Sequence, residues 1–435
     1  MTIGKGCLTL ALQCAILGTE EKMLKTYKYR IYPDKEVVGK LEWTLACCCE
    51  TYNAALQERR DRYNITIRQH PNYYDLAWRK QAVKEHSISL YDQQNQLSLM
   101  KKERTEYLEL TAAHLLNDVC NRIDKAFKRF FDRAKSGQTP GYPRFRSHKR
   151  YDSFCYPDKS GWKVEGKMLT LTRIGTIKMK LHRPIGGKIK TCTIKREGEH
   201  WYVTFSCEME AKKLSLSYED VGIDLGVTHL ATLSTGETIE HPRHLRRADK
   251  KMKQLHQALS RKKKKPKSSK RREKAKVRLN RAYRKVRNQR ADYLHKASRQ
   301  LVNRYQVIVF EDLQTANLVK RPKPKQDEET KEYLPNGAAA KGGLNKSILD
   351  AGWSMFVNMV KSKAEEAGRT MLTVNPKYTS QICSGCGAVK KKTLDERWHS
   401  CECGTELDRD HNAAINILRL GQKELARIAV LKDAS

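Results

Sequence analysis

The sequence predicts an α/β protein in which a small β domain is interrupted by an all-helical insert and followed by a mixed domain containing a zinc ribbon. Three observations support this prediction. Between Tyr151 and Glu210 the apolar residues alternate with polar ones, as in antiparallel strands. Long stretches before and after this region have apolar residues at helical spacing. Near the C-terminus, two cysteine pairs flank a hydrophilic insert of fourteen residues.

Composition points to a polyanionic partner. Lys and Arg number 86 against 49 Asp and Glu, which gives a formal net charge of +37 over 435 residues. An excess of this size favours nucleic acid as the partner. No run of about 18 apolar residues occurs, so the sequence predicts no membrane span. The cysteines outside the ribbon show no paired spacing and are expected to be small buried residues in a reducing cytoplasm.

Residues 1–22 form a separate leader. Lys5 followed by CLTLALQCAILG mimics the core of a short signal peptide. We favour an upstream start codon that adds a dispensable, disordered leader, because zinc thiolates and nucleic acid both indicate the cytoplasm.

The β domain is expected to be a small barrel or sandwich. The alternation in KTYKYRIYP predicts an early strand over 23–33 that completes the strands of 150–213. The intervening residues 34–149 then form a helical insert. Its first helix starts at Asp34 and has Leu41, Leu45, Cys48 and Tyr52 on one stripe, and a longer helical segment runs from about 93 to 134.

The segment GQTPGYPRFRSHKR, residues 137–150, is a basic loop. Arg144 and Arg146 lie beside Tyr142 and Phe145, and cations next to aromatic rings suit phosphates and unpaired bases. A linker whose aromatic rings pack locally explains the same residues equally well.

The C-terminal half alternates strands with helices. Asp224 lies in a predicted strand that is followed by a returning strand, and a fully apolar strand over 306–312 contains Glu311 near its end. Further expected elements are a basic helical hairpin over 244–304, a mobile loop over 318–346, a helix over 348–367, a strand over 371–374 and a helix from His411.

Two sets of side chains could bind metal. Cys383, Cys386, Cys401 and Cys403 can surround one structural Zn²⁺ at about 2.3 Å. Asp224, Glu311 and Asp410 supply the oxygen ligands that Mg²⁺ prefers, and two such ions can activate water and neutralise a leaving oxygen at a phosphodiester. Two simpler explanations stay open: Asp408 or Asp410 could be a helix N-cap, and Glu311 could pair with a Lys or Arg.

Several segments resemble the TnpB/OrfB family of transposon-encoded proteins, which is related to the compact type V CRISPR effectors. They are GIDLGVTHLAT, VIVFEDLQTANL, NPKYTSQICSGCG and CECGTELDRDHNAAINI, with KTYKYRIYP, YNAAL and AFKRFF earlier in the chain. The resemblance covers 23–421. It implies an RNA-guided DNA endonuclease with a RuvC-like RNase H fold.

Site residues follow from the resemblance position by position. Asp224, Glu311 and Asp410 match the RuvC triad, since the third acid stands two residues before Asn412. The four cysteines match the zinc ribbon, and Tyr52 and Asn53 are candidates for reading DNA. The implied domains are a wedge barrel (23–33 and 150–213), a helical recognition domain (34–149), a RuvC-like nuclease (214–374 and 404–435) and the ribbon (375–403).

The resemblance implies cleavage of double-stranded DNA next to a short motif that the protein reads. It also implies that the protein acts as a monomer and binds guide RNA from the transposon end, at the nucleoid of a prokaryotic cytoplasm. "Transposase" is an expected family name. Three alternatives are an RNA-guided repressor without cleavage, an accessory factor for a separate transposase with the ribbon as its interaction module, and an RNA-independent resolvase. The three acids in place disfavour the repressor.

Overall fold

A computed structural model of the chain describes residues 22–104, 111–262, 269–393 and 396–433. The chain divides into two compact units, Lys22–Glu210 and the part from Ala211 onward. Each unit is described by itself. The predicted leader, residues 1–22, lies outside the described residues except for Lys22.

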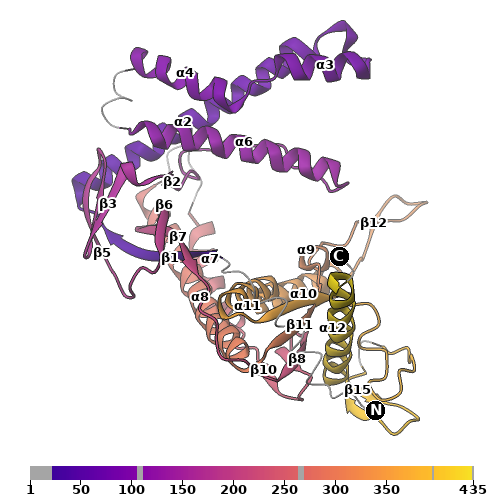
Figure 1. Cartoon of the computed structure of the whole chain (residues 1–435). Helices are drawn as coiled ribbons and strands as arrows, with labels where there is room; N and C mark the ends of the chain where they lie inside the picture. Colours follow the sequence, from indigo (N-terminus) through magenta and orange to yellow (C-terminus); the bar gives the residue numbers. More distant parts are fainter. Residues whose placement is uncertain (1–21, 105–110, 263–268, 394–395, 434–435) are drawn as a thin grey trace. The chain divides into compact units, whose positions relative to one another are not determined.

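One antiparallel sheet of seven strands forms the base of the first unit, in the order β2-β6-β7-β1-β5-β4-β3 (Figure 1). The early strand β1 pairs with β7 from Lys22↔Glu210 to Ile31↔Trp201, which confirms that it completes this sheet. Among the described residues the end strands β2 and β3 are not paired with each other. The strands are β1 Lys22–Tyr32, β2 Ser153–Tyr156, β3 Trp162–Glu165, β4 Met168–Leu171, β5 Gly175–Met179, β6 Lys188–Glu197 and β7 His200–Glu210.

Helices between β1 and β2, with the short η3 between β2 and β3, make up most of the rest of this unit. Asp34 caps the first helix as predicted, because its side chain accepts a hydrogen bond from the Val37 amide at 2.8 Å. The expected single helical segment over 93–134 is wrong. Helix α4 ends at Glu103, and α6 starts only at Ala113, after Ala112 in an extended conformation. The elements are α2 Lys35–Tyr63, η1 Asn64–Arg68, η2 Pro71–Tyr74, α3 Leu76–His86, α4 Leu90–Glu103, α6 Ala113–Lys135 and η3 Lys159–Gly161.

Six of the seven cysteines of the first unit are core residues, as predicted, and Cys155 is partly buried. Cys47, Cys48 and Cys49 in α2 are buried, and so are Cys120, Cys192 and Cys207. Burial raises the pKa of the Cys48 thiol, so it stays neutral and packs as a small apolar group.

The second unit contains a mixed sheet of five strands in the order β10-β9-β8-β11-β14. Strand β11 pairs in parallel with β8 and with β14, and all its residues are buried. This confirms the expected central strand. The strands are β8 Asp220–Leu225, β9 His229–Leu233, β10 Thr238–Glu240, β11 Val307–Glu311 and β14 Thr370–Val374.

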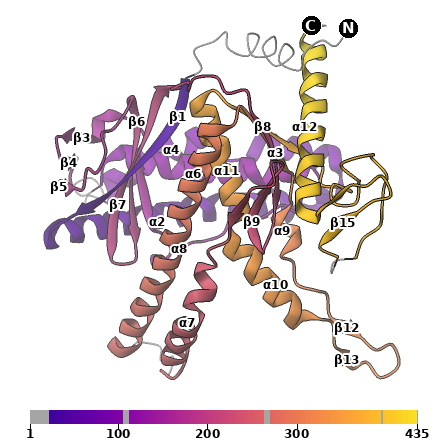
Figure 2. The ribbon, with the colours of Figure 1, turned by 90° about the horizontal axis from the view of Figure 1, so that it is seen from below.

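Helices cover both faces of this sheet (Figure 2). The C-terminal helix α12, Arg409–Asp433, packs on the face that carries Val307 and Val309. Helices α8, Lys270–Arg304, and α11, Trp353–Ala367, pack on the opposite face against Ile308 and Phe310. Gly222 permits α12 to approach β8 closely, because a Cβ there would lie 2.2 Å from the Ala414 carbonyl oxygen.

The predicted basic hairpin is present, and its two helices, α7 (His244–Ser260) and α8, lie side by side (Figure 2). Asp350 joins the two helices of this hairpin to each other and to the rest of the second unit. Its buried carboxylate accepts from the Leu245 amide at the start of α7, at 2.9 Å, and from Arg290 of α8, at 2.7 Å. The α7 helix has no side-chain cap of its own, so Asp350 replaces it.

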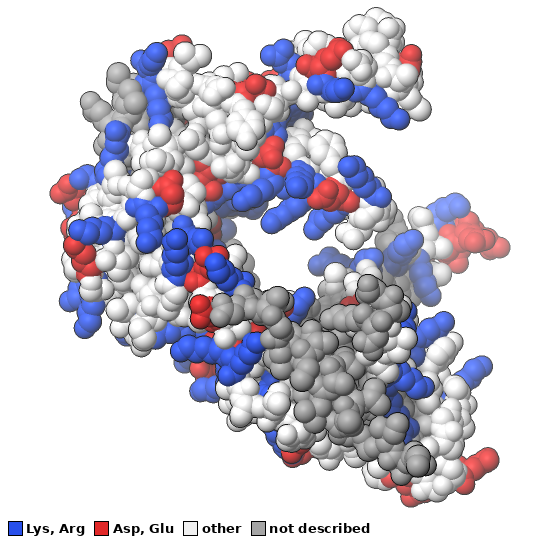
Figure 3. Space-filling model, in the orientation of Figure 1, with Lys and Arg blue, Asp and Glu red and all other residues white. Residues whose placement is uncertain are grey.

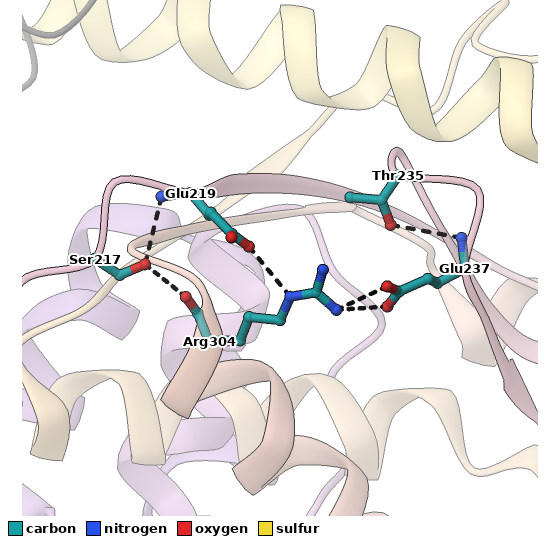
Figure 4. A network of polar contacts seen from close by, with 5 residues as sticks. All are labelled: Ser217, Glu219, Thr235, Glu237 and Arg304. Atoms are coloured by element: carbon teal, nitrogen blue, oxygen red, sulfur yellow. Dashed lines mark hydrogen bonds and ion pairs between the residues drawn. The ribbon is translucent and has the colours of Figure 1, made fainter.

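The end of α8 is fixed to the sheet by Arg304 (Figure 4). Its guanidinium contacts Glu219 at 3.1 Å and both carboxylate oxygens of Glu237 at 2.7 and 2.8 Å. The Ser217 hydroxyl donates to the Arg304 carbonyl oxygen at 2.6 Å. Because Glu219 immediately precedes β8, this network lies at the end of β8 away from Asp224.

Two expectations between 318 and 367 differ from the structure. The expected loop contains a short hairpin and the first part of a helix, and the expected single helix is two helices. Gly352, with φ of 73°, ends α10 and starts α11 because a left-handed residue cannot continue a helix. The elements are α9 Thr315–Leu318, β12 Lys325–Gln326, β13 Tyr333–Leu334 and α10 Ala338–Ala351, and the ribbon adds β15 Trp398–Ser400 and β16 Glu406–Asp408.

None of the helices in the described parts of the chain is long and apolar enough to cross a membrane.

Candidate active site and metal centre

Asp224 and Glu311 lie on the same face of the five-stranded sheet. In β8 the alternate residues Val221, Ile223 and Leu225 enter the core on the α8 and α11 side, so Asp224 shares the α12 side with Gly222. Glu311 follows Val307 and Val309, which also contact α12. The last paired positions of the two parallel strands are Ile223 and Phe310, so the next residues, Asp224 and Glu311, are neighbours across the strands.

Asp410 reaches this pair from the first turn of α12. The preceding acid, Asp408, is the helix cap: its Oδ1 accepts from the amides of Asp410 at 2.9 Å and His411 at 3.3 Å. The Asp410 carboxylate is therefore not used as the cap. It lies beside the end of β8, since a Cβ at Gly226 would be 3.9 Å from Asp410 Oδ2.

The three carboxyl groups interact electrostatically. Burial raises the pKa of Asp224 well above its usual range, and the negative charges of Glu311 and Asp410 raise it further, against a lowering by the Arg409 guanidinium. Burial and the charge of Asp410 also raise the pKa of Glu311, against a lowering by the Thr379 hydroxyl. Among the described residues no Lys or Arg forms an ion pair with Glu311, so the simpler explanation for this acid lacks support.

The four cysteines form a compact cluster. Their sulfur atoms all lie within 4.8 Å of one another, with Cys383 and Cys403 at 3.7 Å and Cys386 and Cys401 at 3.6 Å. A tetrahedral site with bonds of about 2.3 Å requires sulfur atoms about 3.8 Å apart, so this cluster fits Zn²⁺. Among the described residues, no other group of three or more His, Cys, Asp or Glu side chains has its ligand atoms all within 4.8 Å of one another. The carboxylate oxygens of Asp224, Glu311 and Asp410 are therefore not all this close to one another.

Backbone amides prepare Cys383 for a metal. Burial opposes ionisation of this thiol, but the amides of Cys386 and Gly385 point at its sulfur, the latter at 3.3 Å. Together with side-chain hydrogen bonds they lower the pKa of Cys383 to about 5. These hydrogen bonds favour the thiolate, which is the form that binds zinc.

Comparisons with known proteins agree with the motifs. Three family models match: "Probable transposase" over 204–321, "Cas12f1-like, TNB domain" over 353–417 and "Helix-turn-helix domain" over 23–67. A Streptomyces pristinaespiralis protein named "Putative RNA-guided DNA endonuclease" is 30% identical over 408 residues, which cover 92% of this chain and 90% of the relative. This chain belongs to the TnpB/OrfB family.

A second relative of this TnpB/OrfB protein is "Putative RNA-guided DNA endonuclease InsQ" of Escherichia coli K12. It is 28% identical, and the match covers 93% of this chain and 94% of the relative. The solved structure of the mini-RNA-guided endonuclease CRISPR-Cas phi3 matches with 10% identity and a TM-score of 0.43, covering 92% of both chains.

Two residues that the resemblance to the TnpB/OrfB family suggested for DNA contact have structural partners in the first unit. The Tyr52 side chain is 4% exposed, and its ring lies 6.2 Å from that of Tyr151. Asn53 donates to the Arg146 carbonyl oxygen at 2.8 Å and accepts from the Arg146 amide at 2.9 Å. The structure thus places Tyr52 in the core and uses Asn53 to fasten the 137–150 loop, and a DNA contact by either stays a prediction.

The basic loop of this TnpB/OrfB protein shows the local aromatic packing expected of a linker, and nucleic-acid contact by its arginines stays a prediction. Tyr142 packs against Phe127 and Phe130 with ring centroids 5.6 and 5.5 Å apart, as expected of a linker. Arg144 and Arg146 are exposed, although the Arg146 guanidinium lies 5.2 Å above the Tyr52 ring. The two arginines belong to the first unit and the three acids to the second.

Lys and Arg side chains gather along α6 in the space-filling view (Figure 3). The exposed members are Lys125, Lys128, Arg129, Arg133 and Lys135. Arg122, which the helical period places on the same face, is instead half-buried and pairs with Asp118 at 2.7 Å. This surface suits a phosphate backbone.

Sequence reasoning missed the residues that support the acids. The Thr379 hydroxyl donates to Glu311 Oε1 at 2.5 Å, and Asn412 and Asn416 bind the backbone around Cys383 from α12. A Thr carries no chemical signature in a sequence. The asparagines had one usable signal: they are spaced by four residues, so they share the apolar face of the last helix.

Proposed function

We propose that this TnpB/OrfB protein is an RNA-guided DNA endonuclease that cuts double-stranded DNA next to a short motif read by the protein. One observation carries the proposal: Asp224, Glu311 and Asp410 come from two strands and a helix to the same edge of one sheet, and their charges interact. The names of its two relatives support the RNA-guided activity.

The proposed nuclease fold is RuvC-like. The sheet topology supports this assignment. Strands β8, β9 and β10 form an antiparallel meander, which the parallel strands β11 and β14 continue, and two of the acids lie at the ends of β8 and β11. The ribbon and α12 would complete it, and the first unit would supply the wedge sheet and the helical recognition domain.

Asp224, Glu311 and Asp410 would hold two Mg²⁺ ions, which supply Lewis-acid activation of water and charge neutralisation at the leaving oxygen. The chain's own contribution is to keep three carboxylates together without a neutralising cation at Glu311, so that a divalent ion completes the site. Asp408 keeps Asp410 available by capping α12 in its place. The four cysteines would hold one structural Zn²⁺.

The proposed partners are guide RNA from the transposon end and a matching DNA duplex, bound by a protein monomer at the nucleoid of a prokaryotic cytoplasm. The test is to purify the protein with its bound nucleic acid, sequence the RNA and measure Mg²⁺-dependent cleavage of a matching plasmid. Co-purifying RNA without cleavage would favour the RNA-guided repressor. Absence of RNA would favour the transposition accessory factor or the RNA-independent resolvase.

A further inference from the structure

The carboxylate of Glu311 is oriented by a residue from the segment that leads into the ribbon. Thr379 and Glu311 are 4% and 7% exposed, and the Thr379 hydroxyl donates to Glu311 Oε1 at 2.5 Å. The alternative acceptor for this hydroxyl proton, the Pro376 carbonyl oxygen, is more distant at 3.2 Å. One hydroxyl donates one hydrogen bond at a time, so the charged carboxylate is its preferred acceptor.

Thr379 is itself held by the helix that carries Asp410. Asn416 Nδ2 donates to the carbonyl oxygen of Thr379 at 2.9 Å and to that of Ile382 at 2.7 Å. Asn416 is buried, so its amide has no water to replace these partners.

The same helix also grips the first cysteine knuckle. Asn412, which is fully buried, donates to the Ile382 carbonyl oxygen at 2.8 Å and accepts from the Ser384 amide at 2.8 Å. These two residues flank Cys383. The knuckle, α12 and the Thr379 backbone are thus joined by buried hydrogen bonds, and Glu311 is bound to the last of them.

We propose that Thr379 is a positioning residue for Glu311, and that the metal-loaded Cys383 knuckle fixes Thr379 through Asn412 and Asn416. This inference rests on the proposed function, because it assigns Glu311 to a divalent-cation site. With Oε1 held by Thr379, the carboxylate has one rotational setting, and Oε2 is the oxygen left for a cation. The ribbon then has a second role besides stabilising the fold, because it fixes the orientation of the Glu311 carboxylate.

The first experiment compares Thr379→Val with Thr379→Ser in the RNA-bound protein. We expect the valine variant to need about 10- to 100-fold more Mg²⁺ for half-maximal cleavage, as for other groups that orient metal ligands. The serine variant keeps the hydroxyl and should restore most of the loss. Thr373→Val, at an exposed position of β14, is the matched control and should match the wild type.

A readout without catalysis accompanies this comparison. Mg²⁺ alone is titrated against the unfolding temperature of each RNA-bound variant. We expect the Mg²⁺-induced rise to shift to higher concentration in Thr379→Val and to be unchanged in Thr379→Ser and Thr373→Val. Equal Mg²⁺ requirements in the valine and serine variants would overturn the positioning role.

The second experiment tests the connection to the ribbon with Asn416→Ala. We expect the zinc content to stay at that of the wild type while the Mg²⁺ requirement rises in both cleavage and unfolding. An unchanged Mg²⁺ requirement would overturn the coupling. The proposed function is judged separately: if the wild type cleaves and Asp224→Asn does not, it stands whatever the Thr379 and Asn416 variants do.

Discussion

At the scale of single residues, Asp224 combines burial with the negative charges of Glu311 and Asp410, which the nearby Arg409 guanidinium offsets only in part. Its raised pKa means that the folded protein holds this proton more tightly than the unfolded chain does. The stability that this group contributes is therefore present at low pH. It is lost as the pH rises from the ordinary pKa of an aspartate through the raised value.

Asp224→Asn should therefore separate stability from activity. At neutral pH without Mg²⁺, we expect the free energy of unfolding to rise, by about 1.4 kcal/mol for each unit by which the wild-type pKa is raised. Cleavage should fall about a thousandfold or more, since several kcal/mol of transition-state stabilisation are lost. Thermal unfolding and single-turnover cleavage measure the two effects.

Glu328→Gln removes one exposed negative charge in the same unit and is the control, with little expected change in either quantity. If Asp224→Asn were less stable than the wild type without Mg²⁺, the electrostatic account of these acids would be wrong.

The sequence indicated where the three acids lie better than it indicated which side chains hold them in place. Asp224 stood out because a carboxylate within an apolar strand needs a partner, and the structure places it beside Glu311. Tyr52 shows the opposite case. Its helical stripe with Leu41 and Cys48 predicted a core position, which the structure has, whereas the family resemblance suggested DNA contact. Thr379 could not be found, because its role depends on a hydrogen bond between segments 68 residues apart.

At the scale of elements, the contact between β8 and α12 brings Asp410 to the other acids. Gly222 makes this contact possible, since a Cβ there would lie 2.2 Å from the Ala414 carbonyl oxygen and 2.5 Å from the Leu418 nitrogen. These are backbone atoms of a helix and cannot move singly. The alternating pattern showed a strand at this place, but the close approach of the helix depends on tertiary packing.

Gly222→Ala should push α12 away from the sheet. We expect a loss of about 1–3 kcal/mol in the free energy of unfolding, the usual cost of overpacking, together with weaker cleavage. Denaturant unfolding provides the measurement. Gly342→Ala, where a Cβ would have no atom within 4 Å, should leave the stability equal or slightly higher. Equal stabilities of the Gly222 variant and the wild type would contradict the packing argument.

The ribbon is the element whose spacing in the sequence was most informative. Four sulfur atoms at tetrahedral separations predict one Zn²⁺ per chain, measurable by elemental analysis of the purified protein. Cys386→Ser should lower the zinc content and the unfolding temperature, because structural zinc contributes folding free energy. Cys155→Ser, in the other unit, should keep the zinc. A full zinc complement in the Cys386 variant would refute the site.

Element boundaries were predicted less well where backbone conformation decides them. The apolar period continues through Gly352, so the sequence indicated one helix, but the left-handed backbone at this glycine divides it. Similarly, helices α4 and α6 share one apolar period and are nevertheless separate.

At the scale of the whole molecule, the charge of +37 should dominate nucleic-acid affinity. We expect the dissociation constant for RNA to rise steeply with salt, because binding releases counterions from phosphates. Replacing Lys125, Lys128 and Arg129 by Ala should reduce the slope of log affinity against log salt by about 0.7 to 0.9 for each phosphate that these side chains neutralise. Lys163→Ala, at a lysine paired with Glu165, should not change it. An unchanged slope in the triple variant would exclude the α6 surface.

In the proposed reaction, three carboxylates at one sheet edge cut DNA that a bound RNA selects. The most direct measurement is cleavage of a plasmid that carries the sequence of the co-purified RNA, with Mg²⁺, by the wild type and by Asp224→Asn. We predict cleavage by the wild type alone, and only of the matching plasmid. Cleavage that persists in Asp224→Asn, or that ignores the RNA sequence, would contradict the account.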